Sequence, residues 1–157
     1  MDTVKKVADS ITEQTFVLMP KDLNGQHCLF GGQLMSWIDV LAGIVAKRHS
    51  QHMVVTAAVD NLQFKEGAGD GDILVLIGKI TYVGSSSMEV RVDTYVESLD
   101  GIRRTINRAY LVLVALDENG KPVRVPRLEL VTESEKAEWE GGKRRSELRR
   151  QRRIEGF

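Results

Sequence analysis

The segment from residue 22 to residue 46, DLNGQHCLFGGQLMSWIDVLAGIVA, constrains the fold more than any other part of this chain. It consists of a polar loop, a Gly-Gly pair and an apolar run that contains a single acidic residue. At 3.6 residues per turn, an apolar stripe forms around Ile38, as expected for a helix that is buried along one side. We therefore predict a long helix that ends near Lys47 or Arg48. Its stripe comprises Leu34, Met35, Ile38, Leu41, Ala42 and Val45, and the adjacent flank holds Gly32, Asp39, Gly43 and Ala46.

The residues after this helix alternate in the manner of β-strands. Short turns separate the strands, and short turns join antiparallel neighbours. In residues 88–96 one face is apolar and the other polar, so we expect one face to be buried and the other to face water. The fold class is therefore α+β, with a helix covering one face of an antiparallel sheet. The predicted strands are 11–19, 53–64, 73–83, 88–96 and 103–116.

The C-terminal third gives two further predictions. Residues 109–116 are apolar on both faces, which indicates either a central strand or a contact between subunits. Thr132 and Glu135 have the spacing of a capping box for a last helix, which the pair Gly141-Gly142 is expected to break or loosen. We divide the chain into a domain of residues 1–131 and a helical tail of residues 132–157.

Charge and composition narrow the class of protein. The 22 basic and 22 acidic residues cancel, so we expect no nucleic-acid partner. The longest apolar run is eight residues, too short for a bilayer, and the N-terminus has no secretory pattern. Cys28 has no second cysteine with which to form an internal disulfide, which fits a reducing compartment. We expect a cytoplasmic protein without membrane insertion.

The tail is strongly basic. Residues 143–153 hold seven basic residues and one acidic residue, which leaves 15 basic against 21 acidic residues elsewhere. Such a tail indicates a solvated helix face, a contact with a phosphate-bearing ligand, or a contact with another part of the protein.

Asp39, Gly31 and Gly32 are the first candidates for chemistry. Asp39 is either an ordinary polar residue at the edge of the stripe or a general base in the space left by its small neighbours. Gly31 and Gly32 either allow close packing or present unpaired amides at the positive end of the helix dipole. Such amides stabilise an oxygen that gains negative charge during a reaction.

The histidines and the cysteine give no site of their own. His27 and Cys28 are adjacent, and neighbouring side chains of an extended segment point to opposite sides. We therefore do not expect a Cys-His nucleophile. His49 and His52 have no third ligand at a recognisable spacing, so we predict no metal site.

Taken together, these residues resemble the acyl-CoA thioesterases of the hot-dog fold, in the branch of the cytosolic acyl-CoA hydrolases. The resemblance covers residues 15–130. One departure concerns the third residue after Asn24, which is commonly Gly in the family and is His27 here. The matching residues are Asp22–Asn24, Phe30–Met35, Trp37–Asp39, Arg48-His49, Thr56–Asp60, Phe64, Gly71-Asp72, Tyr82–Gly84 and Ser86–Val90.

The resemblance implies a long central helix wrapped by a curved antiparallel sheet of about five strands. It also implies a dimer whose sheets join edge to edge, with active sites at the interface, and often three such dimers in a hexamer. The implied catalytic pair is Asn24 and Asp39, which would meet across a subunit boundary. The implied substrate is acyl-CoA, so that coenzyme A is part of substrate and product and no separate cofactor is expected.

A mechanism follows as a hypothesis. The Gly32 amide, assisted by Gly31, polarises the thioester carbonyl, while Asp39 activates water or attacks directly, and Asn24 orients the water or the thioester. The phosphates or the pantetheine arm of coenzyme A would contact the turn Gly84, Ser85, Ser86 and Ser87. The basic tail, with Arg145, Arg149 and Arg153 at helical spacing, would contact the ribose phosphate.

Two alternatives remain open at this point. One is an acyl-thioester hydratase or dehydratase of the same fold, in which His27 would work against an acid. The other is an acyl-CoA-binding regulatory module that has lost turnover.

Overall fold

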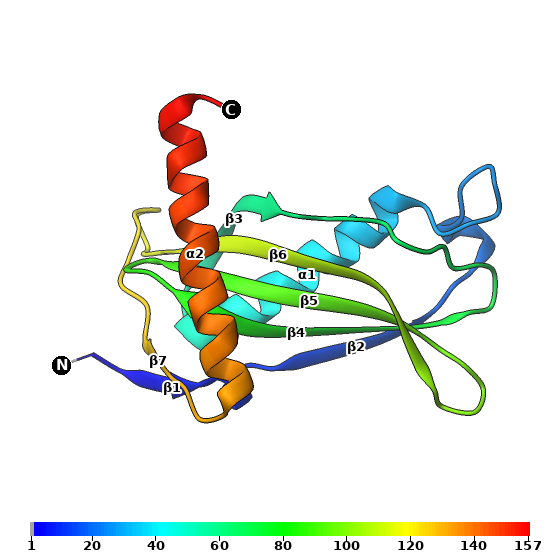
Figure 1. Cartoon of the computed structure of the whole chain (residues 1–157), viewed down its shortest axis with the longest axis horizontal. Helices are drawn as coiled ribbons and strands as arrows, with labels where there is room; N and C mark the ends of the chain where they lie inside the picture. Colours follow the sequence, from blue (N-terminus) through cyan, green and yellow to red (C-terminus); the bar gives the residue numbers. More distant parts are fainter. Residues whose placement is uncertain (1) are drawn as a thin grey trace.

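A curved antiparallel sheet with a helix on each face makes up the fold (Figure 1). The structure, a computed structural model, describes residues 2–157. α1 (Gly31–Ser50) packs on the inner face, and α2 (Glu133–Glu155) crosses the outer face. The sheet contains β2 (Thr12–Val17), β3 (Met53–Asp60), β4 (Ile73–Val83), β5 (Ser87–Glu97) and β6 (Arg103–Leu116) in the order β2-β4-β5-β6-β3. The short elements are β1 (Val4–Lys6), η1 (Val7–Asp9), η2 (Pro20–Asp22) and β7 (Arg127–Glu129).

The core forms where α1 lies in the curve of the sheet. The predicted apolar stripe is confirmed for Leu34, Ile38, Leu41, Ala42 and Val45, all of which are fully buried. Gly78 of β4 allows the close approach, since a Cβ there would lie 3.0 Å from Cγ2 of Val45. The stripe is rotated slightly from the predicted one, because Met35 is 43% exposed and Ala46 is fully buried. In the described chain, neither helix is long and apolar enough to cross a membrane.

The predicted strands are confirmed, and the position of β6 resolves one open alternative. β6 pairs with β5 on one side and with β3 on the other, so it is a central strand and not an edge that could pair with another subunit. The edges of this sheet are β2 and β3. The parallel pair β1–β7 was not predicted, because strands of three residues are too short to show a periodic pattern.

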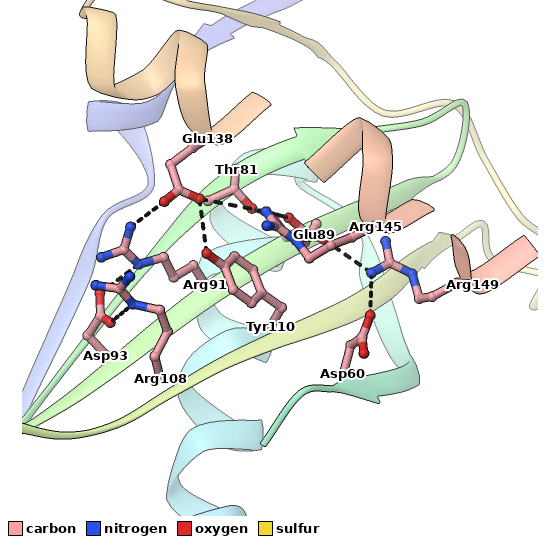
Figure 2. Close-up of polar contacts among 10 residues, drawn as sticks. All are labelled: Asp60, Thr81, Glu89, Arg91, Asp93, Arg108, Tyr110, Glu138, Arg145 and Arg149. Carbon is pink, nitrogen blue, oxygen red and sulfur yellow. Dashed lines mark hydrogen bonds and ion pairs between the residues drawn. The ribbon is translucent and has the colours of Figure 1, made fainter. Parts of the chain in front are cut away.

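The prediction of a wet outer face is wrong. Glu89 of β5 is only 1% exposed, because α2 lies over it, and Asp93 is only 5% exposed beside Arg91 and Arg108 of the sheet. Arginines of α2 and of the sheet pair with these carboxylates (Figure 2). An alternating polar pattern indicates that a face is not apolar, but it does not distinguish contact with water from contact with polar side chains.

The prediction that Gly141-Gly142 breaks the last helix is also wrong. α2 begins after the Thr132 cap as predicted and runs without interruption to Glu155. Gly142 is where this helix comes closest to the sheet, since a Cβ at this position would lie 2.6 Å from Cβ of Tyr82. The low helix propensity of glycine destabilises α2 locally, but the absence of a side chain at this position allows the helix to contact β4.

The two glycines give a matched test of this packing. We expect Gly142→Ala to lower the free energy of unfolding by about 1–3 kcal/mol, because the new methyl group overlaps backbone-anchored atoms of Tyr82. Gly141→Ala adds the same group where it meets mainly the flexible end of Arg145, so it should be neutral or stabilise by up to about 1 kcal/mol. Urea titration of both variants measures the difference. Equal effects would contradict the close approach at Gly142.

His49 secures the C-terminal end of α1 to the chain that precedes β7. The ring is fully buried, and its Nε2 lies 2.9 Å from the carbonyl oxygen of Pro126. A carbonyl only accepts, so Nε2 carries the proton and Nδ1, which has no partner in the described chain, is unprotonated. Burial lowers the pKa of His49 below its ordinary value, and the nearby Lys5 acts in the same direction.

This burial predicts a loss of stability in mild acid. Below pH about 6.5 the unfolded chain takes up a proton on His49 while the folded protein does not. The free energy of unfolding therefore decreases as the pH is lowered, until the folded ring also takes up a proton. His49→Gln keeps a donor for Pro126 but removes the titrating ring. The slope of the free energy of unfolding against pH should therefore be smaller in the variant, by less than about 1.4 kcal/mol per pH unit. Urea titrations between pH 5 and 8 provide the comparison. Parallel curves for the two proteins would contradict a buried neutral ring.

Candidate active site

The N-terminus of α1 presents two free backbone amides. Phe30 occupies the N-cap position, and its side chain offers no capping hydrogen bond. The amides of Gln33 and Leu34 donate to the Phe30 carbonyl, but within residues 2–157 no acceptor is found for those of Gly31 and Gly32. Unpaired donors at the positive end of a helix dipole favour a negatively charged oxygen. This arrangement has the form of an oxyanion site.

Both glycines also leave space for aromatic rings. A Cβ at Gly31 would lie 3.3 Å from the ring of Phe64, and a Cβ at Gly32 would lie 2.6 Å from the ring of Phe30. The glycines therefore pack against these two rings and not against the sheet, and this packing is compatible with the electrostatic role of their amides. Small residues let the two rings flank the helix end while the amides stay accessible.

Asp22 fixes the loop before α1. Its carboxylate, 2% exposed, accepts hydrogen bonds from the amide of Met19 at 3.0 Å and from Nε2 of Gln33 at 2.9 Å. These bonds lower the pKa of Asp22, the Met19 amide contributing most. The Asp22 carbonyl accepts from the Phe30 amide at 2.9 Å. One residue thus ties the loop to both η2 and the first turn of α1.

Asn24 organises the loop between these anchors. Its Oδ1 accepts from the amides of Gln26 at 2.8 Å and Cys28 at 3.2 Å. Because both partners are backbone donors, the atom facing them must be the oxygen, and the Nδ2 group faces outward as a donor. His27 has φ of 59°, the left-handed conformation that glycine favours, so the histidine keeps the backbone shape expected at this position.

Asp39 lies on the exposed side of α1 and is paired with β3. The hydroxyl of Thr56 donates to Oδ1 of Asp39 at 2.6 Å, and Oδ2 has no partner in the described chain. Thr56 is one of the residues that carry the family resemblance, but the sequence indicated no role for it. A contact between a helix and a strand has no characteristic spacing along the chain.

Two cavities flank the N-terminal half of α1, and the predicted catalytic residues are divided between them. One, of about 420 Å³, is lined by Asn24 and Gly31 together with Phe64 and Lys65. The other, of about 340 Å³, is lined by Gly32, Asp39 and Thr56. A single chain therefore brings Asp39 near Gly32 but does not place Asn24 in the same cavity. The remaining lining residues are mostly apolar: Leu29, Leu34 and Ile106 in the first, and Met35, Ile38, Val59, Leu62 and Leu111 in the second.

The turn Gly84–Ser87 lies at the end of the sheet where α1 ends (Figure 1). Its backbone is already engaged: the carbonyls of Gly84 and Ser85 accept from Arg127, and that of Ser86 accepts from the Ala115 amide. The hydroxyls of Ser85, Ser86 and Ser87 make no hydrogen bond within the described residues. They are the groups of this turn that remain available to a ligand.

Arg149 lies on the outer face and not beside α1. Its guanidinium is paired with Asp60 and Glu89 (Figure 2), and Arg145 likewise contacts Glu89 and the ring of Tyr110. Arg153 is exposed on the far end of α2. Of the residues in the described chain, no three His, Cys, Asp or Glu are arranged to bind a metal.

Comparison with known proteins adds a family. A model described as the thioesterase superfamily matches residues 26–101. An uncharacterized acyl-CoA thioester hydrolase of Bacillus subtilis, YkhA, is 44% identical over 128 residues, covering 81% of this chain and 74% of that protein. The cytosolic acyl coenzyme A thioester hydrolase of Rattus norvegicus is 35% identical over 130 residues, which span 80% of this chain but 34% of the rat protein.

Solved structures agree. An acyl-CoA hydrolase from Staphylococcus aureus, determined with butyryl coenzyme A and coenzyme A, superimposes with a TM-score of 0.92 at 36% identity, covering 98% of this chain and 94% of that one. A hexameric acyl-CoA thioesterase superimposes with a TM-score of 0.92 at 39% identity, covering 96% of this chain and 97% of that one. The Staphylococcus aureus protein was also solved with an Asn, an Asp or a Thr replaced by Ala. Those residues are 15 and 17 positions apart, as are Asn24, Asp39 and Thr56 here.

Proposed function

This chain belongs to the acyl-CoA thioester hydrolases of the thioesterase superfamily, and we propose that it cleaves acyl-CoA into free coenzyme A and a carboxylic acid. The observation that carries the proposal is the carboxylate of Asp39, held by Thr56 in a cavity that also contains Gly32. This cavity combines a base, a helix N-terminal amide and an apolar wall, which are the groups that thioester hydrolysis requires.

In the proposed reaction the carbonyl oxygen of the thioester accepts from the Gly32 amide, with Gly31 beside it. Because Thr56 occupies Oδ1 of Asp39, Oδ2 is the oxygen that takes a proton from water. The water oxygen bonds to the carbonyl carbon, the tetrahedral intermediate collapses, and the C–S bond breaks. The proton held by Asp39 then passes to the departing thiolate. The spacing shared with the Asn, Asp and Thr varied in the Staphylococcus aureus hydrolase supports these three residues as parts of the site.

A second route has the same groups but a covalent step. Asp39 attacks the carbonyl carbon and the C–S bond breaks, so that coenzyme A leaves as the thiolate. Water then cleaves the resulting anhydride, and the proton released in that step passes to the thiolate. A single turnover in H₂¹⁸O tests the covalent route. Incorporation of ¹⁸O into Asp39 shows that water attacked the aspartyl carbon of an anhydride, a step that general-base catalysis does not contain. Label in the product acid alone is expected for general-base catalysis, and it also follows if water attacks the acyl carbon of the anhydride.

Asn24 is proposed to act from a second subunit. Its oxygen is used by its own loop, so its contribution is the Nδ2 donor, directed at the thioester or the attacking water. Since Asn24 and Asp39 line different cavities of one chain, a site containing both requires a second copy. We propose a dimer through the free edge of β3, and three such dimers in a hexamer like that of the similar hexameric thioesterase.

Coenzyme A is proposed to enter as part of the substrate and to leave as product, without a separate cofactor. The turn Gly84, Ser85, Ser86 and Ser87 stays the predicted contact for its phosphates or pantetheine arm. The contact would be made through the three hydroxyls, because the amide and the carbonyl of Gly84 are already hydrogen-bonded. Arg149 as a phosphate ligand also stays a prediction, although its guanidinium is already paired with two carboxylates. The lone cysteine supports a cytoplasmic location.

Replacement of Asp39 tests the function. We expect the wild-type protein to release free thiol from acetyl-, butyryl-, octanoyl- or palmitoyl-CoA, and Asp39→Asn to lower kcat at least about 10²-fold while KM stays similar. Glu118→Gln, an exposed carboxylate in the turn after β6, is the control and should retain full activity. A thiol reagent follows the release. Tight binding of every acyl-CoA without turnover would contradict the proposed hydrolase activity and would support an acyl-CoA-binding regulatory module.

The proposed dimer predicts which surface substitutions matter. Val55 on β3 is 48% exposed in the single chain, and a charge there should split the assembly because it would be buried at the subunit contact. We expect Val55→Asp to reduce the mass measured by light scattering toward one chain and to lose activity. Val131→Asp, at a residue that is 57% exposed and lies between β7 and α2, should change neither. A wild-type monomer that hydrolyses acyl-CoA would contradict a shared site.

A further inference from the structure

A buried ion-pair network ties α2 to the outer face of the sheet (Figure 2). At its centre is Glu89 of β5, whose side chain is 1% exposed. Its carboxylate accepts from Arg145 at 2.8 and 3.1 Å, from Thr81 at 2.7 Å and from Arg149 at 3.2 Å. A carboxylate in this position is stable only while these donors remain in place.

Arg149 links two strands that are not neighbours. Its Nη1 lies 3.0 Å from Oδ2 of Asp60 in β3 and 3.2 Å from Oε2 of Glu89 in β5, and its side chain is 11% exposed. β6 lies between these strands, so the contact spans about 10 Å of sheet. Arg152 adds a contact with Asp60 at 3.3 Å, but it is 45% exposed and therefore more strongly screened by water.

β3 is the strand that gains most from such a link. In the described chain it pairs only with β6, and its register shifts between Thr56 and Ala58. Asp60 is the last residue of the ladder, and Asn61 after it has φ of 58°, where the chain turns away. The last residues of a strand, beyond a bulge and next to a sharp turn, open more readily than the middle of the ladder. Arg149 holds that end from the outer face.

The same strand carries the partner of Asp39. Thr56 donates to Asp39 on the inner side, and Val59 with Leu62 lines the same cavity. We propose that Arg149 is a positioning residue: by holding Asp60, it fixes the end of β3 and thereby keeps Thr56 and the cavity wall in place for Asp39. This inference rests on the proposed hydrolase activity, and it gives the basic tail a role other than binding a phosphate.

The first test compares neighbouring arginines. Arg149→Gln should lower kcat about tenfold with KM for acyl-CoA changed less than about twofold, since a displaced Thr56 affects the reacting groups more than the bound substrate. Arg149→Lys should restore part of the loss, because the charge remains but an ammonium lacks the forked geometry. Arg150→Gln, an exposed arginine without a partner in the described chain, should match wild type. A raised, salt-dependent KM with unchanged kcat would overturn the proposal and identify Arg149 as a phosphate ligand.

The second test asks whether Arg149 acts through Thr56. The two residues lie on opposite faces, so a general loss of stability would give independent effects on kcat. If Arg149 positions Thr56, then Arg149→Gln should cost less than about twofold when Thr56→Val is already present. Additive effects in this double-mutant cycle would rule out the proposed link.

Hydrogen exchange provides a readout that does not depend on activity. Amides of residues 53–60 should exchange faster in Arg149→Gln than in Arg150→Gln, while both retain wild-type circular dichroism. Unchanged exchange overturns the anchoring even if the wild type is active. An inactive wild type with faster exchange in the variant defeats the proposed function but not the anchoring. If Arg149→Gln does not fold, Asp60→Asn serves in its place, since it weakens the same contact and leaves Arg149 paired with Glu89.

Discussion

The packing of α1 into the curve of the sheet is the constraint on which the rest of the structure depends. Its buried side chains fill the core, and Gly78 lets the helix approach β4 closely. Because the helix is buried along one side only, its other side and its N-terminal amides stay available. Asp39 and the amides of Gly31 and Gly32 are therefore carried by the element that also contributes most to the core, which makes their positions rigid.

The two faces of the sheet are stabilised by different physics. The inner face is apolar, and its burial against α1 follows from the hydrophobic effect. The outer face holds carboxylates that α2 removes from water, and arginines compensate the loss of hydration. Such a network contributes more to geometry than to net stability, since charged groups must meet in a defined arrangement to offset desolvation. That property suits a role in fixing the end of β3.

Most of the fold could be predicted from local patterns. The turns on either side of residues 73–83 and 103–116 gave the bounds of β4 and β6, and the glycine pair with the apolar stripe gave the start of α1. Asp39, Asn24 and the two glycines were identified by their setting and by the family resemblance. Thr56, by contrast, acquired a role only when the strand and helix were placed side by side. Gly142 was misread, because its penalty is local while its benefit lies 60 residues away in Tyr82.

The sequence by itself determined the α+β class, the order of elements and the residue types at the α1 N-terminus, because hydrophobic periodicity and backbone preferences act over a few residues. Only the tertiary structure decided that the polar face of β5 is covered, that β6 is internal, and that Asn24 and Asp39 occupy separate cavities of one chain. These facts depend on pairings between residues far apart in the chain. A polar side chain has the same sequence signature whether it meets water or an arginine, and the distinction arises only when the chain has folded.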